Sequence, residues 1–200
     1  MTFYDFAKVV CGIPLRTFWR LRAVGSEHVP RSGGLIVASN HMSYLDPPSL
    51  GVALPRPLYY MAKQELFDIP LLGPTIRATN AFPVDRARGD IGAIKRTVEM
   101  LRAGHAVAIF PEGGRNKNGQ AKARSGVALL ASLSGAPVLP AYIAGTDRTH
   151  SLAPITVIFG EPFVPGGERK ATREDLANWT DDIMGRIFAL REQLRANQKG

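Results

Sequence analysis

The stretch LIVASNHMSYLDP, residues 35–47, is the most informative part of the chain for the fold. Residues 35–39 form an apolar run of the length expected for a strand that is covered on both faces of a sheet. In α/β sheets with such strands, functional groups lie where the strands end and the loops begin. The polar residues that follow this strand, beginning with Asn40 and His41, are therefore candidates for chemistry.

Outside this stretch, strand-like and helix-like segments alternate along the chain. Further strands are expected at residues 58–62, 106–110, 138–143 and 155–159, and helices at 91–101, at 127–133 and from about residue 172 onward. This alternation is typical of an α/β domain with a largely parallel sheet. We therefore predict a single α/β domain with a mostly parallel central sheet flanked by helices, plus an N-terminal amphipathic helical segment.

His41 and Asp46 are a candidate base and its carboxylate partner. A neutral imidazole, with an unperturbed pKa of about 6.5, can take a proton from a hydroxyl near pH 7. A carboxylate at the other ring nitrogen would fix the tautomer and stabilise the imidazolium. The spacing alone is a weak signal, since chance places an Asp five residues after some His about one time in six. In the alternative interpretation Asp46 caps a helix that begins at Pro47, and its two oxygens could serve both roles.

The loop expected after residue 110 carries a second group of candidates, Glu112, Gly113, Gly114 and Arg115. Amides with glycine freedom can wrap an anion, and an arginine can clamp a phosphate with two hydrogen bonds. A carboxylate beside them can accept a hydrogen bond from a glycerol hydroxyl. The combination suits a polyol phosphate. The alternative is a surface turn in which the Glu and Arg side chains form a solvated pair.

Arg86 is a second candidate clamp, although it follows Asp85 and a surface ion pair of little energetic worth is the alternative. The sequence shows no credible metal-ligand cluster and no dinucleotide fingerprint, so neither a metal nor a cofactor is expected. Cys11 lies in an apolar run and is expected to be a small core residue. A single cysteine also excludes an internal disulfide framework.

The N-terminal segment, residues 1–22, is expected to be amphipathic and to consist of two pieces separated at Gly12 and Pro14. Apolar and aromatic side chains beside arginines suit a helix that lies on an anionic membrane surface. The alternative is a first helix that packs on the core of the domain, and the two roles are compatible. The apolar positions of the first piece share one helical face: Phe3, Phe6, Val9 and Val10.

The net charge of +8 and the pI of about 10.0 suggest an anionic partner, which could be a phosphate, a nucleic acid or an anionic membrane surface. Nucleic acid is disfavoured, because the sequence has no zinc-finger spacing, basic-region heptads or ribonucleoprotein aromatic motif. No apolar stretch approaches the length of about 18 residues that a spanning helix needs. The N-terminus also lacks the pattern of a signal peptide.

Four blocks in order make the chain resemble the glycerolipid acyltransferase family. Residues 40–47 match the His and Asp block, and residues 80–86 (NAFPVDR) match a block that ends in Arg86, with Asn80 in place of Gly. Residues 110–115 (FPEGGR) match a third block with Gly114 in place of Thr, and residues 137–140 (PVLP) match a fourth. The resemblance covers roughly residues 25–165. Asn80 can tolerate the left-handed backbone conformation that favours Gly there.

The resemblance implies acyl transfer from a thioester, either acyl-CoA or acyl carrier protein, to the glycerol hydroxyl of a lysophospholipid. Lysophosphatidate conversion to phosphatidate is the first choice. Residues 1–22 would then be a membrane-associating segment and residues 23–200 the acyltransferase domain, peripheral to the cytoplasmic face of the cell membrane. The resemblance implies these roles: His41 and Asp46 catalytic; Arg86, Glu112, Gly113, Gly114 and Arg115 substrate-binding.

Three alternatives stay open at this point. The acceptor could be another lyso-lipid, such as a lyso-ornithine lipid. The same His and Asp could activate water in a thioesterase-like hydrolase. A non-catalytic lipid-binding protein is the third alternative, and the intact set of His41, Asp46, Glu112 and Arg115 argues against it.

Overall fold

The computed structural model describes residues 2–85, 90–116, 122–166 and 171–197. Its centre is a sheet in the order β1-β7-β6-β2-β5-β3-β4, in which β6, β2, β5, β3 and β4 are mutually parallel. β7 runs antiparallel to β6, and β1 pairs parallel with β7. The strands are β1 (Arg22–Val24), β2 (Leu35–Ser39), β3 (Leu58–Lys63), β4 (Ala81–Val84), β5 (Ala106–Ile109), β6 (Val138–Ala144) and β7 (Thr156–Phe159). The predicted α/β domain with a mostly parallel sheet is confirmed.

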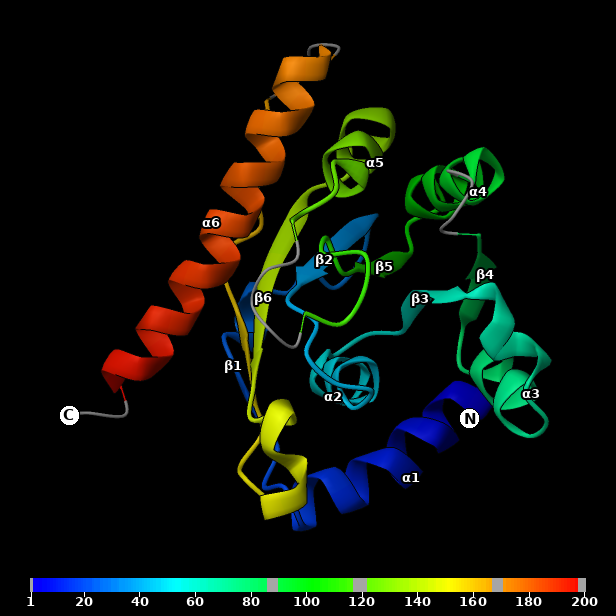
Figure 1. Cartoon of the computed structure of the whole chain (residues 1–200), viewed down its shortest axis with the longest axis vertical. Helices are drawn as coiled ribbons and strands as arrows, with labels where there is room; N and C mark the ends of the chain where they lie inside the picture. The colour runs from blue at the N-terminus through cyan, green and yellow to red at the C-terminus, as the bar shows by residue number, and fades with distance from the viewer. Residues whose placement is uncertain (1, 86–89, 117–121, 167–170, 198–200) are drawn as a thin grey trace.

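The side chains of β2 alternate between two apolar cores, because successive residues of a strand point to opposite faces. Leu35 and Val37 join the core that includes residues of α1 and α2, whereas Ile36 and Ala38 join the core with α4, α5 and α6. Every residue of β2 is buried, as the apolar run predicts. Figure 1 shows the long α6 beside the sheet and α1 running beneath α2. The helices are α1 (Phe3–Thr17), α2 (Asp46–Ala53), α3 (Leu72–Ala78), α4 (Ile91–Arg102), α5 (Gly126–Ser134) and α6 (Arg173–Asn197).

Capping side chains and a glycine mark the ends of several helices. The Asp90 side chain accepts the Ala93 N–H at 2.8 Å and caps α4. Thr172 and Asp175 exchange hydrogen bonds at the start of α6. Gly135, with a φ of 70°, closes α5 in the left-handed conformation. Three short 3₁₀ helices complete the described elements: η1 (Ser26–His28), η2 (Gln64–Asp68) and η3 (Thr146–Ser151).

The first helix differs from its prediction, because α1 continues through Gly12 and Pro14 rather than breaking there. Gly12 lies on the buried side of α1, where a Cβ would make an ordinary contact of 3.5 Å with the Val52 side chain of α2. Pro14 lies near the end of the helix, where the turn that follows still closes through the bond from the Phe18 N–H to the Pro14 carbonyl. The predicted break was therefore wrong.

One face of α1 packs on the domain. Tyr4 and Leu15 are buried, and the Tyr4 hydroxyl accepts the Leu58 N–H at 3.1 Å. The ammonium of Lys8 donates to the Leu54 carbonyl at the end of α2. The face opposite to these contacts exposes its apolar side chains: Phe3, Phe6, Val9, Val10 and Ile13 are 50–62% exposed. Core packing, one of the two alternatives that the sequence left open for this helix, is thus present on one side, and the other side presents apolar side chains to solvent.

Two further details depart from the sequence predictions. Cys11 is exposed on α1 rather than part of the core, because apolar residues occupy the outer as well as the inner face of this helix. β1 was not predicted, since its three residues are all exposed and carry no alternation of apolar side chains. In contrast, the left-handed conformation suggested for Asn80 is confirmed by its φ of 66°. Within the described residues, no helix is long and apolar enough to cross a membrane.

Candidate active site

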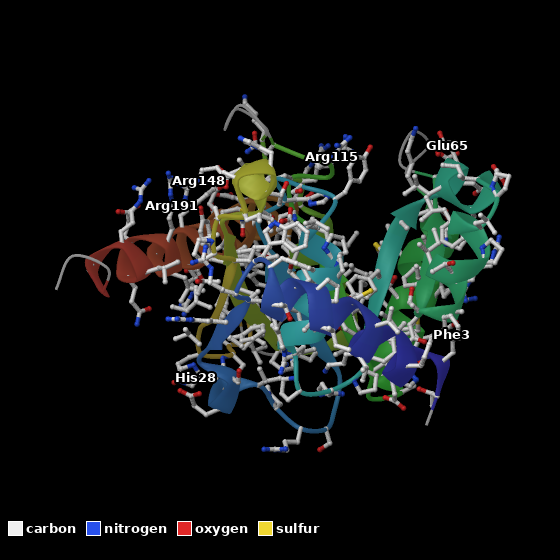
Figure 2. All side chains as sticks on the ribbon, turned by 90° about the horizontal axis from the view of Figure 1, so that it is seen from below. Phe3, His28, Glu65, Arg115, Arg148 and Arg191 are labelled. Atoms are coloured by element: carbon white, nitrogen blue, oxygen red, sulfur yellow. The ribbon has the colours of Figure 1, made fainter. Side chains whose placement is uncertain are left out.

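Two neighbouring parallel strands deliver the predicted site residues to one edge of the sheet. β2 and β5 pair in register from Leu35 with Ala106 to Ala38 with Ile109, so the loops that follow them emerge side by side. The His41 and Phe110 rings stack with centroids 4.3 Å apart. Figure 2 shows Arg115, from the loop after β5, at the same edge as Arg148 and Glu65, which follow β6 and β3. This edge is the carboxyl end of the parallel strands.

His41 and Asp46 are in direct contact. The His41 Nδ1 lies 2.9 Å from the Asp46 Oδ2, and the same oxygen accepts the N–H groups of Met42 at 2.6 Å and Ser43 at 2.7 Å. Since a carboxylate only accepts hydrogen bonds, Nδ1 carries the proton in this pair and Nε2 is left as the basic nitrogen. Asp46 is fully buried, and the side chain of His41 is 12% exposed.

The interpretation of Asp46 as a helix cap was wrong. Asp46 is the first residue of α2, Leu45 occupies the capping position, and no side chain caps this helix. Instead the carboxylate turns back to the Met42 and Ser43 amides, which precede the helix. The tight loop between β2 and α2 therefore closes around one carboxylate oxygen, and the same oxygen orients the imidazole of His41.

Asn40 ties the end of β2 to β6, a contact that the sequence did not predict. Its side-chain amide donates to the Ile143 carbonyl at 2.9 Å and accepts the Ile143 N–H at 2.7 Å. These two bonds extend the pairing of the strands beyond Ser39 and Ala141, the last pair in the register. Asn40 is buried, so the residue before His41 is held in place independently of the loop after β5.

Glu112 and Asn116 hold the backbone of His41 from the other side. The Glu112 Oε2 accepts the His41 N–H at 2.8 Å, and the Asn116 N–H donates to the His41 carbonyl at 2.7 Å. The Asn116 Nδ2 also donates to the Glu112 Oε1 at 3.1 Å. Burial raises the pKa of the Glu112 carboxyl above its ordinary value, while the bonds from Asn116 and the His41 backbone work in the opposite direction.

Arg115 lies over an aromatic ring from the first loop. Its guanidinium carbon is 3.7 Å from the centre of the Tyr44 ring, and both side chains are exposed. Gly113 has a φ of 69°, and its N–H donates to the Phe110 carbonyl at 2.9 Å. A Cβ added to Gly114 would meet nothing within 4 Å, so this position borders open space. Arg86, the other predicted clamp, lies outside the described residues.

An apolar cavity of about 220 Å³ lies behind this loop, between the carboxyl end of β5 and the first turns of α4 and α5. Its lining is mostly apolar and includes Met61, Ile94, Phe110 and Val127. Asp90 and Arg124 are among its polar residues. Among the described residues, no group of three or more His, Cys, Asp or Glu side chains is arranged to hold a metal ion.

A His–Asp pair, a glycine-bearing loop with an exposed arginine and a neighbouring apolar cavity thus share one sheet edge. Comparison with known proteins places the whole chain in a family. The family model described as acyltransferase matches residues 20–144. The chain belongs to the acyltransferase family. The resemblance inferred from the four sequence blocks is therefore confirmed, and the protein is an enzyme of this family.

Similarity to individual acyltransferases extends beyond the matched residues. The chain is 31% identical over 196 residues to the 1-acyl-sn-glycerol-3-phosphate acyltransferase of Bacillus subtilis, covering 96% of this chain and 98% of that protein. It is 25% identical over 203 residues to the Streptococcus pneumoniae enzyme of the same name, covering 96% and 75%. The crystal structure of the 1-acyl-sn-glycerophosphate acyltransferase from Thermotoga maritima matches with a TM-score of 0.74 at 25% identity, covering 94% of this chain and 79% of that one.

Proposed function

We propose that this acyltransferase moves a fatty acyl group from a thioester to the glycerol hydroxyl of a lysophospholipid, and that its acceptor is lysophosphatidate and its product phosphatidate. The observation that carries the proposal is the His41–Asp46 contact of 2.9 Å, which leaves Nε2 as the basic nitrogen. The names of relatives that match nearly the whole chain support the choice of acceptor. The donor is acyl-CoA or acyl carrier protein.

In this proposal the protein supplies a base and no nucleophile of its own. The acceptor hydroxyl oxygen attacks the thioester carbonyl while the His41 Nε2 takes the hydroxyl proton. The buried Asp46 stabilises the imidazolium through Nδ1–H. The tetrahedral intermediate then collapses, the carbon–sulfur bond breaks, and the imidazolium returns the proton to the thiolate. One ester forms, one thioester is lost and one free thiol is released.

Arg115 is proposed to bind the phosphate of the acceptor. It is exposed at the loop edge, and its stacking on Tyr44 holds the guanidinium plane while its N–H groups stay available. A planar guanidinium suits a phosphate because it can donate two parallel hydrogen bonds. Gly113 and Gly114 would let the phosphate approach the backbone, and Arg86 is proposed as a second cation for it.

The apolar cavity is proposed to take part of an acyl chain. It adjoins Phe110, whose ring stacks on His41, so a chain in it would end near the base. Its volume of about 220 Å³ is smaller than the roughly 300–1,000 Å³ typical of pockets for a whole ligand. The cavity therefore fits a portion of one substrate rather than a complete donor or acceptor.

A membrane surface is the proposed source of the acceptor. Lysophospholipids carry acyl chains, and the outer face of α1 presents Phe3, Phe6 and Ile13 to solvent. The net charge of +8 favours an anionic surface such as the cytoplasmic leaflet of the cell membrane. In this arrangement α1 lies flat as a peripheral contact while its inner face stays packed on α2. Residues 1–22 would thus form part of the folded unit as well as its contact with lipid.

The proposal is tested by measuring free-thiol release from acyl-CoA and from acyl carrier protein with a panel of lysolipids, including lysophosphatidate and lyso-ornithine lipid. We expect release that requires a lysolipid, is fastest with lysophosphatidate and yields phosphatidate. Release without any lysolipid would indicate a thioesterase-like hydrolase. No release with any combination would indicate a lipid-binding protein. A different preferred lysolipid would change the acceptor and keep the reaction.

A further inference from the structure

The loop after β5 forms hydrogen bonds with both backbone polar groups of His41, its N–H and its carbonyl. Glu112 accepts the His41 N–H at 2.8 Å through Oε2, and the Asn116 N–H donates to the His41 carbonyl at 2.7 Å. The Asn116 side chain closes the ring by donating to the Glu112 Oε1 at 3.1 Å. Because 71 residues separate Glu112 from His41 in sequence, these bonds join two loops that are far apart along the chain.

These contacts differ from those expected of a substrate ligand. The sequence predicts that Glu112 accepts a hydrogen bond from a glycerol hydroxyl, which requires an oxygen within reach of the acceptor. Glu112 is only 6% exposed, and each of its two oxygens already has a protein donor. Asn116 is 8% exposed. Burying these groups is costly unless they are paired, and here they are paired with each other and with the backbone of the base.

We propose that Glu112 and Asn116 are positioning residues, which hold the His41 main chain so that Nε2 faces the substrate, and that Glu112 does not bind the acceptor. The contacts assign different roles to Asp46 and to the Glu112–Asn116 pair. Asp46 fixes the rotation of the imidazole through Nδ1, and the Glu112–Asn116 pair fixes the point on the backbone from which the ring projects. Both are needed, because a displacement of about 1 Å can cost on the order of 100-fold in rate.

Three variants test this assignment: Glu112→Ala, Asn116→Ala and Glu112→Gln. Glu112→Ala removes the acceptor for the His41 N–H, whereas Asn116→Ala leaves the backbone bond from residue 116 to His41 and removes the side-chain bond to Glu112. In Glu112→Gln the amide oxygen can still accept the His41 N–H. The glutamine variant therefore keeps the connection without the charge.

Steady-state kinetics separate positioning from substrate binding. We expect kcat to fall about 100-fold in Glu112→Ala and about tenfold in Asn116→Ala, with the KM for lysophosphatidate unchanged in both. Glu112→Gln should recover most of kcat. The double alanine variant should be little worse than Glu112→Ala alone, because the two side chains act through one connection. Arg115→Ala provides the matched reference for a lost acceptor contact, since it should raise KM instead.

The interpretation of kcat and KM rests on the proposed function. A spectroscopic measurement therefore tests separately whether Glu112 and Asn116 hold His41 in position. The chain has 4 His, so ¹⁵N-histidine labelling with a His41→Ala reference can assign the Nδ1–H signal of His41. In the ligand-free protein we expect this proton to exchange with water faster in Glu112→Ala and at the wild-type rate in Glu112→Gln. If the wild-type protein transfers no acyl group, the proposed function fails, and this measurement still shows whether Glu112 and Asn116 hold His41 in position.

Two results would overturn the assignment. One is a Glu112→Ala protein with wild-type kcat, wild-type exchange at His41 and a raised KM for the lysolipid, which would make Glu112 an acceptor ligand. The other is unchanged proton exchange in both alanine variants, which would show that the contacts do not hold the base. Melting temperatures establish that each variant is folded. If Glu112→Ala does not fold, the same kinetics and proton-exchange measurements are made on Asn116→Ala and Glu112→Gln. Their comparison then tests the positioning role.

Discussion

The guanidinium of Arg115 lies 3.7 Å from the centre of the Tyr44 ring, so a residue inside the His–Asp loop supports the proposed phosphate ligand. Tyr44 stands between His41 and Asp46 in sequence, and its ring contacts Arg115 of the loop after β5. The two loops are thus connected three times: through this stacking, through the His41–Phe110 stacking and through the Glu112–Asn116 bonds. Base and phosphate ligand are held by one assembly.

Replacing the Tyr44 ring should loosen Arg115 and weaken acceptor binding. An exposed cation–π contact is worth about 0.5–1 kcal/mol, so Tyr44→Ala should raise the KM for lysophosphatidate about two- to fivefold with little change in kcat. Tyr44→Phe keeps the ring and should match the wild-type protein. Initial rates at varied lysophosphatidate check this expectation. Equal KM values for the Ala, Phe and wild-type proteins would show that the stacking has no role in binding.

Removing the guanidinium itself should have a larger effect than removing the ring beneath it. A hydrogen bond to a charged group is worth about 1.5–3 kcal/mol, so Arg115→Ala should raise the acceptor KM on the order of 10- to 100-fold. The KM for the thioester should not change. Arg186→Ala is the matched control, because Arg186 pairs with Asp182 on the surface of α6. A raised KM for the acyl donor instead of the acceptor would remove Arg115 from phosphate binding.

The buried Glu112 makes the stability of the protein depend on pH in a defined direction. Burial raises the pKa of its carboxyl above the ordinary value of 4.5, so the folded state holds this proton more tightly than the unfolded state. The stability gained from the proton is present below about pH 4.5 and is lost as the pH rises through the folded-state pKa. Urea unfolding of wild-type and Glu112→Gln proteins between pH 4 and 7 isolates this effect. The wild-type protein should lose stability relative to Glu112→Gln as the pH rises, and a difference that stays constant would contradict the raised pKa.

The outer face of α1 should bind anionic vesicles. Phe6→Ser and Ile13→Ser remove side chains that are 54% and 62% exposed, so the fold should be unaffected. Burying such a side chain is worth about 1.5–3 kcal/mol, so each change should lower vesicle partitioning by roughly tenfold or more. Ile91→Ser is the matched control, because Ile91 is 79% exposed on α4. Co-sedimentation with phosphatidylglycerol vesicles measures the binding. Equal losses for all three variants would show that the contact is not specific to α1.

These substitutions test lipid binding better than removal of residues 1–22. α1 supplies Tyr4 and Leu15 to the buried interior, and Lys8 bonds to the end of α2. Deleting the segment would expose the surface beneath it and destabilise the domain, so lost vesicle binding could reflect unfolding. Single changes on the exposed face leave those inner contacts in place.

Sequence patterns were sufficient for the parallel sheet and for the edge at which the site lies. The apolar run of β2, the Asp90 cap and the Thr172–Asp175 start of α6 each act over a few residues, and all three are present in the structure. β1 carried no such local signal, because its exposed residues depend on pairing with β7, more than 100 residues away. The interruption predicted at Pro14 was wrong because this proline lies in the last turn of α1, where the Phe18 N–H still bonds to its carbonyl.

The contacts of the site were less predictable than its members. Glu112 could be recognised as a site residue from its block, but the direction of its carboxylate depends on how the loops after β2 and β5 meet. Asn116 and Tyr44 were not predicted as site residues. Their contacts with Glu112 and Arg115 form only when the two loops meet, and the residue types alone do not indicate them. A helix cap was the alternative interpretation of Asp46, because an Asp before a Pro commonly caps a helix. Its carboxylate instead satisfies the amides that precede the helix.

The central claim is that His41 acts as the base in acyl transfer to lysophosphatidate. The most direct test measures thiol release and phosphatidate formation together, for wild-type and His41→Ala proteins. The substitution spares the backbone bonds to Glu112 and Asn116, so the variant should keep its melting temperature. The account predicts equal amounts of thiol and phosphatidate from the wild-type protein and a rate about 10²- to 10⁴-fold lower for His41→Ala. Undiminished phosphatidate formation by a folded His41→Ala protein would contradict it.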